Sequence, residues 1–532
     1  MRKKKTIRVV NSVCNIKSPA VAPIQVDDKN RKVSSVVESL FLPGQQRIGR
    51  LGILNRLYTT VVLIACIVTA GVFVTRAWDK FSMTPIVVNV ETTNYPLYKL
   101  QFPAVTICPA NTVKKTTGEE LLSRYLNMSL DSELRKDLWN FMSALAKCQY
   151  PFYFRMQEHL QQIHSLLPQF ADFNVSRFML QVLPTCSELM DRCFWMGNEV
   201  NCCEIFNLQR TEAGFCYSFN SLTSEKTWNC EGTDEFFRPS KTYKESNESS
   251  KCEPRHNIAS GTTTGLEVFL KPSKPEDSLQ DGQRDKAGTR VYVHLPVQLP
   301  EAGTGVLMPE EQAKVFSVEV TPSVTESSLN VRALSVSERQ CLFPDERRLS
   351  VFNTYTEKNC LLECRLSNIA RFCGCLPYFF SALTADNVPE CNLTQLWCLS
   401  DHNLELRIIK PPKGAPGFEN ITAIDCADCL PTCHDNRYDI HYSYKDDGNP
   451  YAKGSGGYLD VFYKDVSAIK YRQQLAFDVM DLVVSFGGVV SLFLGISLLS
   501  VFQFICLCTL RCVMVYQYMR QHTDIHRRAW ID

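Results

Sequence analysis

The sequence predicts a membrane protein with two transmembrane helices and a large, disulfide-rich extracellular domain of mixed α and β structure. Two uncharged apolar segments, 57–74 and 482–510, each approach or exceed the roughly 20 residues that a helix needs to cross a bilayer. Between them lie 19 of the 24 cysteines and all five N-x-Ser/Thr sequons. Dense cysteines and glycosylation sites are typical of the oxidising extracellular side of a membrane.

The charges beside the two apolar segments predict the orientation of the chain. Residues 1–50 contain 11 basic residues against three acidic ones, and the segment after 510 contains four arginines against two aspartates. Because cytoplasmic flanks carry the excess of basic residues, we expect both termini in the cytoplasm and a multi-pass protein of the plasma membrane. The first apolar segment begins too late for a cleavable signal peptide.

The chain therefore divides into five expected segments. A soluble protein with two core helices is the alternative, but the 29-residue uncharged run is far longer than an ordinary core helix. The expected segments are a cytoplasmic N-terminal segment (1–50), a first transmembrane helix (51–77), an extracellular cysteine-rich domain (78–474), a second transmembrane helix (475–510) and a cytoplasmic tail (511–532).

Composition and motifs exclude several classes of function. A formal net charge of +1 gives no reason to expect a nucleic-acid partner. The sequence contains no G-x-S-x-G, P-loop or H-E-x-x-H pattern, so we expect neither an enzyme nor a cofactor. His159 and His164 are five residues apart on a predicted helix, which is a poor spacing for a metal ion. We expect both side chains in solvent and no metal site.

The extracellular domain is predicted to place helices early and strands later. Segments 118–147 and 154–167 are rich in helix formers with apolar residues at helical spacing. Segments 265–272, 289–297 and 314–323 alternate apolar and polar residues as strands do. The sequons predict glycosylation at Asn127, Asn174, Asn247, Asn392 and Asn420.

Ten cysteines between 341 and 433 predict a disulfide framework whose connectivity the spacing leaves open. Cys360 and Cys364 are one helical turn apart, as are neighbouring cysteines in the returning segment 426–433, so two packed segments could be bridged rung by rung. Redox chemistry at the C-x-x-C pair Cys426 and Cys429 is an alternative. A zinc site is another, built from Cys373, Cys375, Cys391 and Cys398.

Small residues recur along the second apolar segment. Gly487, Ser491 and Gly495 are spaced by four, so they share one helical face, which Gly488 and Ser485 extend. Small residues let helices approach closely in lipid. The stripe therefore fits either simple dimer packing or several copies of the helix around a pore.

Gly495 and Ser497 predict a local interruption of that helix. On an unbroken helix their side chains point about 200° apart, so they cannot share a face. Backbone that leaves the helix inside a bilayer must line a water-filled cavity. Freed carbonyls and hydroxyls are the groups that replace water around a cation in a selectivity filter. The pattern favours a narrow ion-conducting constriction.

Four sequence elements carry a distinctive pattern: FPAVTICPAN (102–111), GFCYSFN (214–220), the cysteine-rich stretch 339–380 and GGVVSLFLGISLLS (487–500). These elements resemble the degenerin/epithelial sodium channel superfamily, and most of all its insect pickpocket branch. The strongest match is the stretch 339–380, and the resemblance covers about residues 40–505.

The resemblance implies an amiloride-sensitive, sodium-permeable channel subunit in a homo- or heterotrimer, with a clenched-hand extracellular domain. It implies that Gly495, Ile496 and Ser497 form the selectivity filter. The pore or the helix crossing would be lined by Val484, Ser485, Gly487, Gly488, Ser491 and Gln503, and Asp478 and Asp481 would attract cations outside it.

The resemblance also implies a set of disulfides that would hold a rigid lever above the membrane. Cys193 would pair with Cys202 or Cys203. The other implied pairs are Cys108–Cys216, Cys341–Cys433, Cys360–Cys429, Cys364–Cys426, Cys373–Cys398 and Cys375–Cys391.

Three departures from the family pattern bear on conduction. The His-Gly pair that gates family members reads Pro43-Gly44, so Gly44 is kept and the histidine is lost. The usual glutamate below the filter reads Gln503, and Val484 replaces a small residue. A ring of glutamines would not concentrate cations as carboxylates do. The alternative function is therefore a non-conducting accessory subunit or cell-surface receptor of the same fold.

Overall fold

The computed structural model describes residues 50–83, 86–109, 111–225, 253–279, 288–310, 314–380, 388–411, 422–446, 454–476, 479–495 and 497–528. The chain forms two units. One comprises Met1–Asp79 with Val479–Asp532, and the other comprises Lys80–Asp478. Gly44, Asp478, Ile496, Asn247 and Asn420 lie outside the described residues, as do Cys230 and Cys252.

Among its described residues, the first unit contains three long helices: α2 (Arg50–Met83), α14 (Val479–Leu494) and α15 (Leu498–Arg528). Within α2, Arg56–Asp79 is long and apolar enough to cross a membrane, with a mean hydropathy of 2.4. Met480–Leu494 and Phe502–Tyr516 are shorter apolar helices. The rings of Phe73 and Phe493 stack with centroids 5.6 Å apart, which joins α2 to α14.

These helices extend beyond the expected transmembrane limits. α2 reaches Met83, whereas we expected its end at residue 77. α15 continues through Arg511 to Arg528, so most of the expected tail is helical. Hydropathy marks where an apolar face ends, but a helix needs only continued backbone hydrogen bonding to run into polar sequence.

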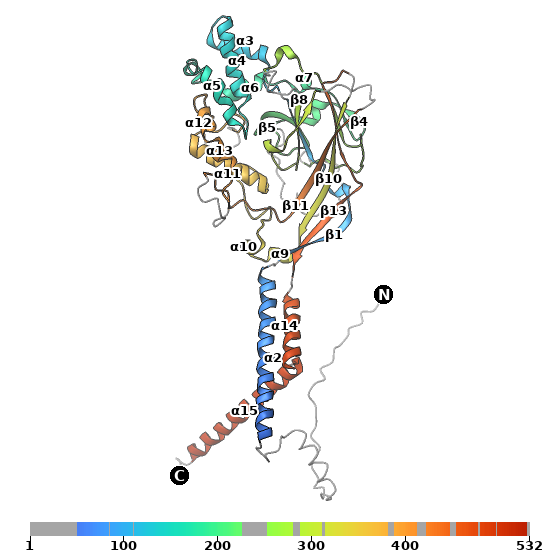
Figure 1. Ribbon diagram of the computed structural model, residues 1–532, viewed down its shortest axis with the longest axis vertical. Helices are drawn as coiled ribbons and strands as arrows, with labels where there is room; N and C mark the ends of the chain where they lie inside the picture. Colours follow the sequence, from blue (N-terminus) through green and yellow to red (C-terminus); the bar gives the residue numbers. More distant parts are fainter. Residues whose placement is uncertain are drawn as a thin grey trace. The chain divides into compact units, whose positions relative to one another are not determined.

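The second unit is built on two sheets (Figure 1). In the larger sheet the order is β1 (Ile86–Pro96), β13 (Ser467–Leu475), β10 (Lys314–Ser327), β12 (Gly457–Tyr463), β7 (Leu266–Leu270), β3 (Met190–Trp195) and β4 (Asn198–Val200), with β11 (Asp435–Asp446) paired to β10. The smaller sheet has the order β5 (Phe206–Thr211), β6 (Gly214–Phe219), β2 (Ala104–Pro109), β8 (Gly288–His294) and β9 (Val306–Pro309).

Strand β10 organises the larger sheet. One of its edges pairs with β11 in antiparallel register, and the other pairs in parallel with β12 and then with β13. β1, which follows α2 in the sequence, is antiparallel to β13, which precedes α14, and their register places Ile86 opposite Leu475. The two strands next in sequence to the apolar helices are therefore bonded to each other.

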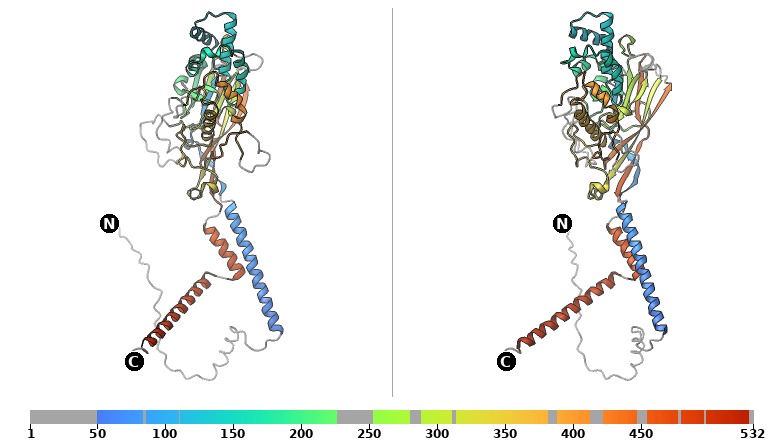
Figure 2. Two further views of the ribbon diagram at one scale, coloured as in Figure 1. Left: turned by 90° about the vertical axis from the view of Figure 1, so that its left-hand side faces the viewer. Right: turned by 60° about the vertical axis from the view of Figure 1, so that its left-hand side comes forward.

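Helices pack beside these sheets. The early group is α3 (Lys115–Leu126), α4 (Ser132–Ala146), α5 (Gln157–Gln162) and α6 (Val175–Val182), and the later group is α11 (Glu357–Cys373), α12 (Leu396–Asp401) and α13 (Asn403–Arg407). Short helices are α7 (Cys186–Leu189), α8 (Cys202–Ile205), α9 (Leu329–Arg332) and α10 (Val336–Arg339). Figure 2 shows the early group and the later group next to each other on one side of the strands.

Local sequence explains where the principal helices begin and end. The Asp131 side chain accepts a 2.7 Å hydrogen bond from the Leu134 amide and caps α4. Thr356 caps α11 in the same way, and Gly374 ends α11 with a φ of +65°. The predicted helical segment 118–147 forms two helices, α3 and α4, and the α-helix in the predicted segment 154–167 is limited to α5. The predicted strands are confirmed as β7, β8 and β10. The expectation that strands come only later is wrong, because β1 to β6 precede residue 220.

Phe102 joins the two sheets. Its side chain is fully buried. It contacts Trp195 and Tyr463 of the larger sheet and Phe219 of the smaller sheet, with ring centroids 5.0, 5.3 and 6.3 Å away. Phe102 and Phe219 come from the FPAVTICPAN and GFCYSFN elements, so two of the characteristic sequence elements meet in one core contact.

Candidate functional site

The second apolar segment contains a helix break at Gly495 and Ser497. α14 ends at Leu494, and Gly495 follows with a φ of +63°, a left-handed conformation that favours glycine. The Gly495 amide still donates to the Ser491 carbonyl at 3.0 Å. Ser497 precedes α15, and its hydroxyl accepts from the Ser500 amide at 3.2 Å, as an N-cap does.

Gly495 and Ser497 therefore act as a helix stop followed by a helix start. A left-handed glycine is the common end of a helix, and a serine that bonds the third following amide is a common beginning. Local capping chemistry explains why the helix breaks at this point of a continuous apolar run. Figure 2 shows α15 leaving the break in a different direction from α14.

Four of the predicted pore residues share one face of α14. At 100° per residue, Val484, Gly487, Gly488 and Ser491 lie about 120–220° around the helix from Phe493, which contacts α2. All four are exposed in the single chain. Ser485 is half-buried and lies beyond the edge of this face. The face is therefore available to another helix or to water.

Charge near this segment is confined to its ends. Gln503 is exposed on α15, and within the described part of 482–510 every side chain is uncharged. Asp481 lies in the first turn of α14, where a carboxylate interacts favourably with the helix N-terminus. The polar groups at the break are hydroxyls and backbone groups, which suit a hard cation more than catalysis.

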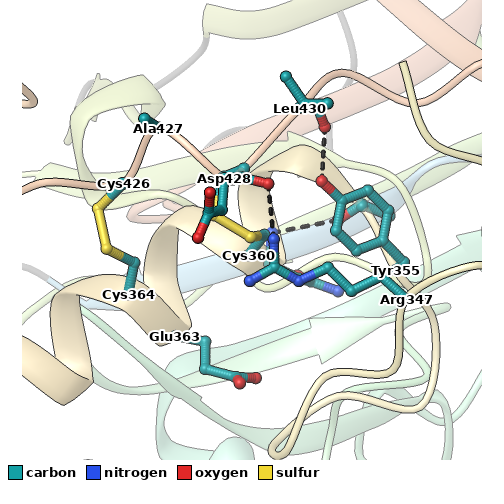
Figure 3. The surroundings of a disulfide bond; sticks show 12 residues. Arg347, Tyr355, Cys360, Glu363, Cys364, Cys426, Ala427, Asp428 and Leu430 are labelled. Carbon is teal, nitrogen blue, oxygen red and sulfur yellow. Dashed lines mark hydrogen bonds between the residues drawn. A yellow bond between two sulfur atoms is a disulfide. The ribbon is translucent and has the colours of Figure 1, made fainter. Parts of the chain in front are cut away.

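The disulfide-rich domain contains a disulfide ladder between α11 and the segment 426–433. Figure 3 shows part of it, where the Tyr355 hydroxyl donates to the Leu430 carbonyl and the Arg347 guanidinium donates to the Asp428 carbonyl, both at 2.6 Å. The returning segment is not helical, so only Cys360 and Cys364 are a helical turn apart. The structure forms the pairs Cys341–Cys433, Cys360–Cys429, Cys364–Cys426, Cys373–Cys398 and Cys375–Cys391.

These disulfides exclude the zinc and redox alternatives for the same cysteines. All four candidate zinc ligands are in disulfides, and Cys426 and Cys429 pair with α11 rather than with each other. Within the described residues, no group of His, Cys, Asp and Glu could hold a metal ion.

The described cysteines that precede the ladder form three further pairs. Cys108–Cys216 joins β2 to β6. Of the two partners left open for Cys193, the structure selects Cys202, and Cys203 pairs with Cys186, a partner that the sequence did not indicate. Cys148 is a free buried thiol, and burial raises its pKa far above the usual range.

The ladder is bonded to the larger sheet at Cys433. The Ser327 hydroxyl, at the end of β10, donates to the Cys433 carbonyl at 2.6 Å, and the Ser327 amide donates to His434 Nδ1 at 3.0 Å. Ser327 pairs with Gln473 of β13, the strand that precedes α14. A continuous set of bonds therefore leads from the ladder through β10 to β13.

Sequence reasoning missed a buried ion pair that links α11 to the smaller sheet. The Arg365 guanidinium contacts the Glu212 carboxylate in the turn between β5 and β6. Both residues are at most 7% exposed. Arg365 also lies over the Tyr150 ring at 3.8 Å, and the Glu212 carbonyl accepts from the Tyr150 amide. The partners are separated by 153 residues, so no local signal could reveal them.

The structure also shows how exposed His159 and the sequon asparagines are, which can be compared with the expectations from the sequence. The structure buries His159, contrary to our expectation, because Lys147 and Asn140 bond its two ring nitrogens at 2.9 and 3.2 Å. Of the sequon asparagines, Asn127 and Asn174 are exposed, whereas Asn392 is half-buried.

Comparison with known proteins gives this geometry a context. Residues 37–507 match the family model described as amiloride-sensitive sodium channel. The chain belongs to that family. The family is one of ion channels and not of enzymes, and it implies sodium ions and a membrane as partners. The sequence resemblance to this family is confirmed.

Three relatives illustrate the range of the family. The chain is 27% identical to the sodium channel protein Nach of Drosophila melanogaster over 465 residues, which cover 84% of this chain and 80% of that protein. It is 24% identical to pickpocket protein 19 of the same species, covering 82% of each chain. It is also 24% identical to the bile acid-sensitive ion channel of Mus musculus, covering 76% of this chain and 73% of the relative.

Proposed function

We propose that this channel-family chain forms a trimeric sodium pathway in the plasma membrane, alone or with related subunits, in which the break at residues 495–497 is the selectivity filter. Both termini are cytoplasmic in this arrangement, as the basic flanks favour. Three copies of Gly495, Ile496 and Ser497 surround the axis. Asp478 and Asp481 attract cations at the outer end, and amiloride blocks the current.

The observation that carries the proposal is the helix break itself. Backbone outside a helix is not tolerated in lipid, since its polar groups would lack partners. A water-filled axis supplies those partners. The exposed hydroxyl of Ser497 and the backbone at Gly495 lie where a partly dehydrated cation could exchange water for protein oxygen.

The small-residue face of α14 supports assembly of several copies around that axis. Gly487, Gly488 and Ser491 lie away from the face that contacts α2, so they are free to meet the same helix of another copy. Small side chains allow that approach. The bonds from the ladder through Ser327 to β13 would transmit movement of the extracellular domain to α14.

Gln503 supports the alternative function of a non-conducting accessory subunit or receptor. Three carboxylates at this position would attract cations, and three amides would not. The intact break at 495–497 favours conduction, because an accessory subunit has no need of backbone that is costly in lipid.

Whole-cell current from the chain expressed alone tests the proposal, with surface delivery checked by labelling. External sodium is replaced by a large organic cation, and amiloride is then added. Gln503→Glu is compared with Gln503→Asn, a matched variant that changes the side chain without adding charge.

We expect an amiloride-sensitive current that disappears without sodium, and a larger current in Gln503→Glu than in Gln503→Asn. Current in Gln503→Glu alone would assign the native chain an accessory role. Silence of all three forms at the surface, with a current only when a related subunit is co-expressed, would restrict the proposal to a mixed trimer.

A further inference from the structure

A cavity lies at one edge of the larger sheet, among elements that the proposed ion pathway does not use. It has a volume of about 410 Å³ and is lined by residues of α7, β3, β4 and α8 and by Lys271, which follows β7. β4 is the last strand at this edge, whereas β1 and β13, which lead to the apolar helices, lie at the other end of the strand order (Figure 1). The volume falls within the range of roughly 300–1,000 Å³ that is typical of small-molecule sites.

Two disulfides hold the walls of this cavity. Cys202 and Cys203 are consecutive residues of α8, and they pair with Cys193 of β3 and Cys186 of α7, respectively. The bond between Cys186 and Cys203 is not among the pairs that the family resemblance implies. Because both bonds leave one short helix, they cross-link α7, β3 and α8 around the cavity. A cavity that is fixed before a ligand arrives loses little freedom when the ligand binds.

A β-bulge directs two consecutive charged residues into the cavity. In the pairing of β3 with β7, Met190 lies opposite Leu270. Arg192 lies opposite the next residue, Phe269, so the register skips Asp191. Consecutive residues of a regular strand point to opposite faces, whereas a bulge re-aims the side chain of its extra residue. The bulge therefore explains how Asp191 and Arg192 both line one cavity.

The cavity is lined by charged side chains of both signs. Asp191 and Glu199 are negative, and Arg192 and Lys271 are positive. All four are exposed. Among the described residues, neither of the two carboxylates accepts a hydrogen bond or forms an ion pair. Lys271 Nζ donates to the Ser187 carbonyl at 2.8 Å, which holds the ammonium in place and leaves it further N–H donors. The cavity therefore offers acceptors for a cation and donors for an anion.

We propose that this cavity binds a small zwitterion of the α-amino-acid type. Its ammonium group lies at Asp191 and Glu199, and its carboxylate lies at Arg192 and Lys271. A ligand with a single charge would meet two groups of its own sign, whereas a zwitterion pairs with all four. Hydrogen bonds between charged partners are the strong ones. Because the four side chains are open to water, which screens their charges, the binding is weak.

Saturation-transfer NMR on the detergent-solubilised full chain tests the proposal, because this method detects weak binding of small molecules. The probe is L-alanine. Ethylamine carries only the ammonium group and propionate only the carboxylate, so the two are half-ligands of similar size. Asp191→Asn and Arg192→Gln each remove one charge from the cavity. Asp172→Asn is the matched control, since Asp172 is an exposed carboxylate that does not line the cavity. Thermal unfolding shows that each variant folds.

We expect L-alanine to bind the native chain and Asp172→Asn equally. Binding to Asp191→Asn and to Arg192→Gln should be weaker by about tenfold or more, because each variant loses a hydrogen bond between charged partners. Both half-ligands should bind the native chain more weakly than L-alanine. No binding of L-alanine to the native chain, equal binding to Asp191→Asn, or a half-ligand that binds as tightly as L-alanine overturns the proposal. The assay needs no current, so its outcome is independent of the proposed function.

Discussion

Substitutions at Gly495 test whether the helix break depends on the left-handed backbone of that residue, because the space around the residue is open. The residue has a φ of +63°, and among the described residues no atom lies within 4 Å of a Cβ built on it. An alanine at this position meets no steric obstacle in the single chain. Its cost is the left-handed backbone alone, about 1–2 kcal/mol for a residue with a Cβ. That cost reduces the population of the broken helix, relative to a continuous one, by a factor of about 5 to 30.

Gly71→Ala is the matched control for this substitution. Gly71 lies inside α2, and a Cβ built on it also meets no described atom within 4 Å. Alanine in a helix interior is favoured over glycine by about 1 kcal/mol, so Gly71→Ala should leave current and stability unchanged or slightly improved. The same change of one methyl group therefore has opposite expected effects at the two positions.

The assay is sodium current per copy at the surface, in whichever of the native and Gln503→Glu forms conducts. We expect Gly495→Asn to retain most of the current, because asparagine tolerates the left-handed region. Gly495→Ala should lose more, and Gly495→Val most, because a β-branched residue is a strong outlier there. Equal currents from Gly495→Ala and Gly71→Ala would refute the argument that a left-handed glycine holds the break open.

The disulfide-rich domain offers three further tests by thermal unfolding of the detergent-solubilised chain. Glu212→Gln should cost about 3–5 kcal/mol, because it leaves the Arg365 guanidinium buried without a counter-charge. The double variant with Arg365→Met should recover part of that loss, and strictly additive losses would show that the pair is not coupled. Burial lowers the pKa of His294 from 6.5 to about 4, so the unfolded chain binds the proton first and stability falls by up to about 3 kcal/mol as pH drops from 6.5 to 4. His294→Gln should remove that part of the acid sensitivity, and an identical pH profile in both proteins would contradict it. Cys186→Ser and Cys203→Ser should each cost about 3 kcal/mol, since their disulfide closes a 17-residue separation. The double variant should cost no more than either one, whereas a doubled loss would argue against the bond.

Elements whose signal is local were predictable from the sequence. The apolar segments, the helices at 115–126 and 132–146 and the Gly-x-Ser interruption all depend on residues close together in the chain. The disulfide ladder came from family resemblance, because spacing alone allows many connectivities. Strands such as β6 were missed for a physical reason. All six of its residues are buried, so the alternation that marks a half-exposed strand is absent.

The sequence alone does not reveal the side-chain pairs that link distant elements of the fold. Glu212 and Arg365 meet across 153 residues. The burial of His159 depends on Lys147 and Asn140, which α4 and the following turn place against α5. A charged or polar residue is expected in solvent unless its partner is known. Each error here concerned a polar side chain whose partner lies on another element.

This division between local and distant causes has a consequence for experiments on the channel. The break at Gly495 and Ser497 is encoded by capping within a few residues, whereas the disulfide-rich domain depends on distant links such as the one between Glu212 and Arg365, which spans 153 residues. Substitutions at the break should therefore change current while surface delivery stays normal. Substitutions in the ladder or at Glu212 should lower delivery first, because they act on folding. A variant such as Gly495→Ala that failed to reach the surface would show that the break also supports assembly, and that its conformation depends on neighbouring copies.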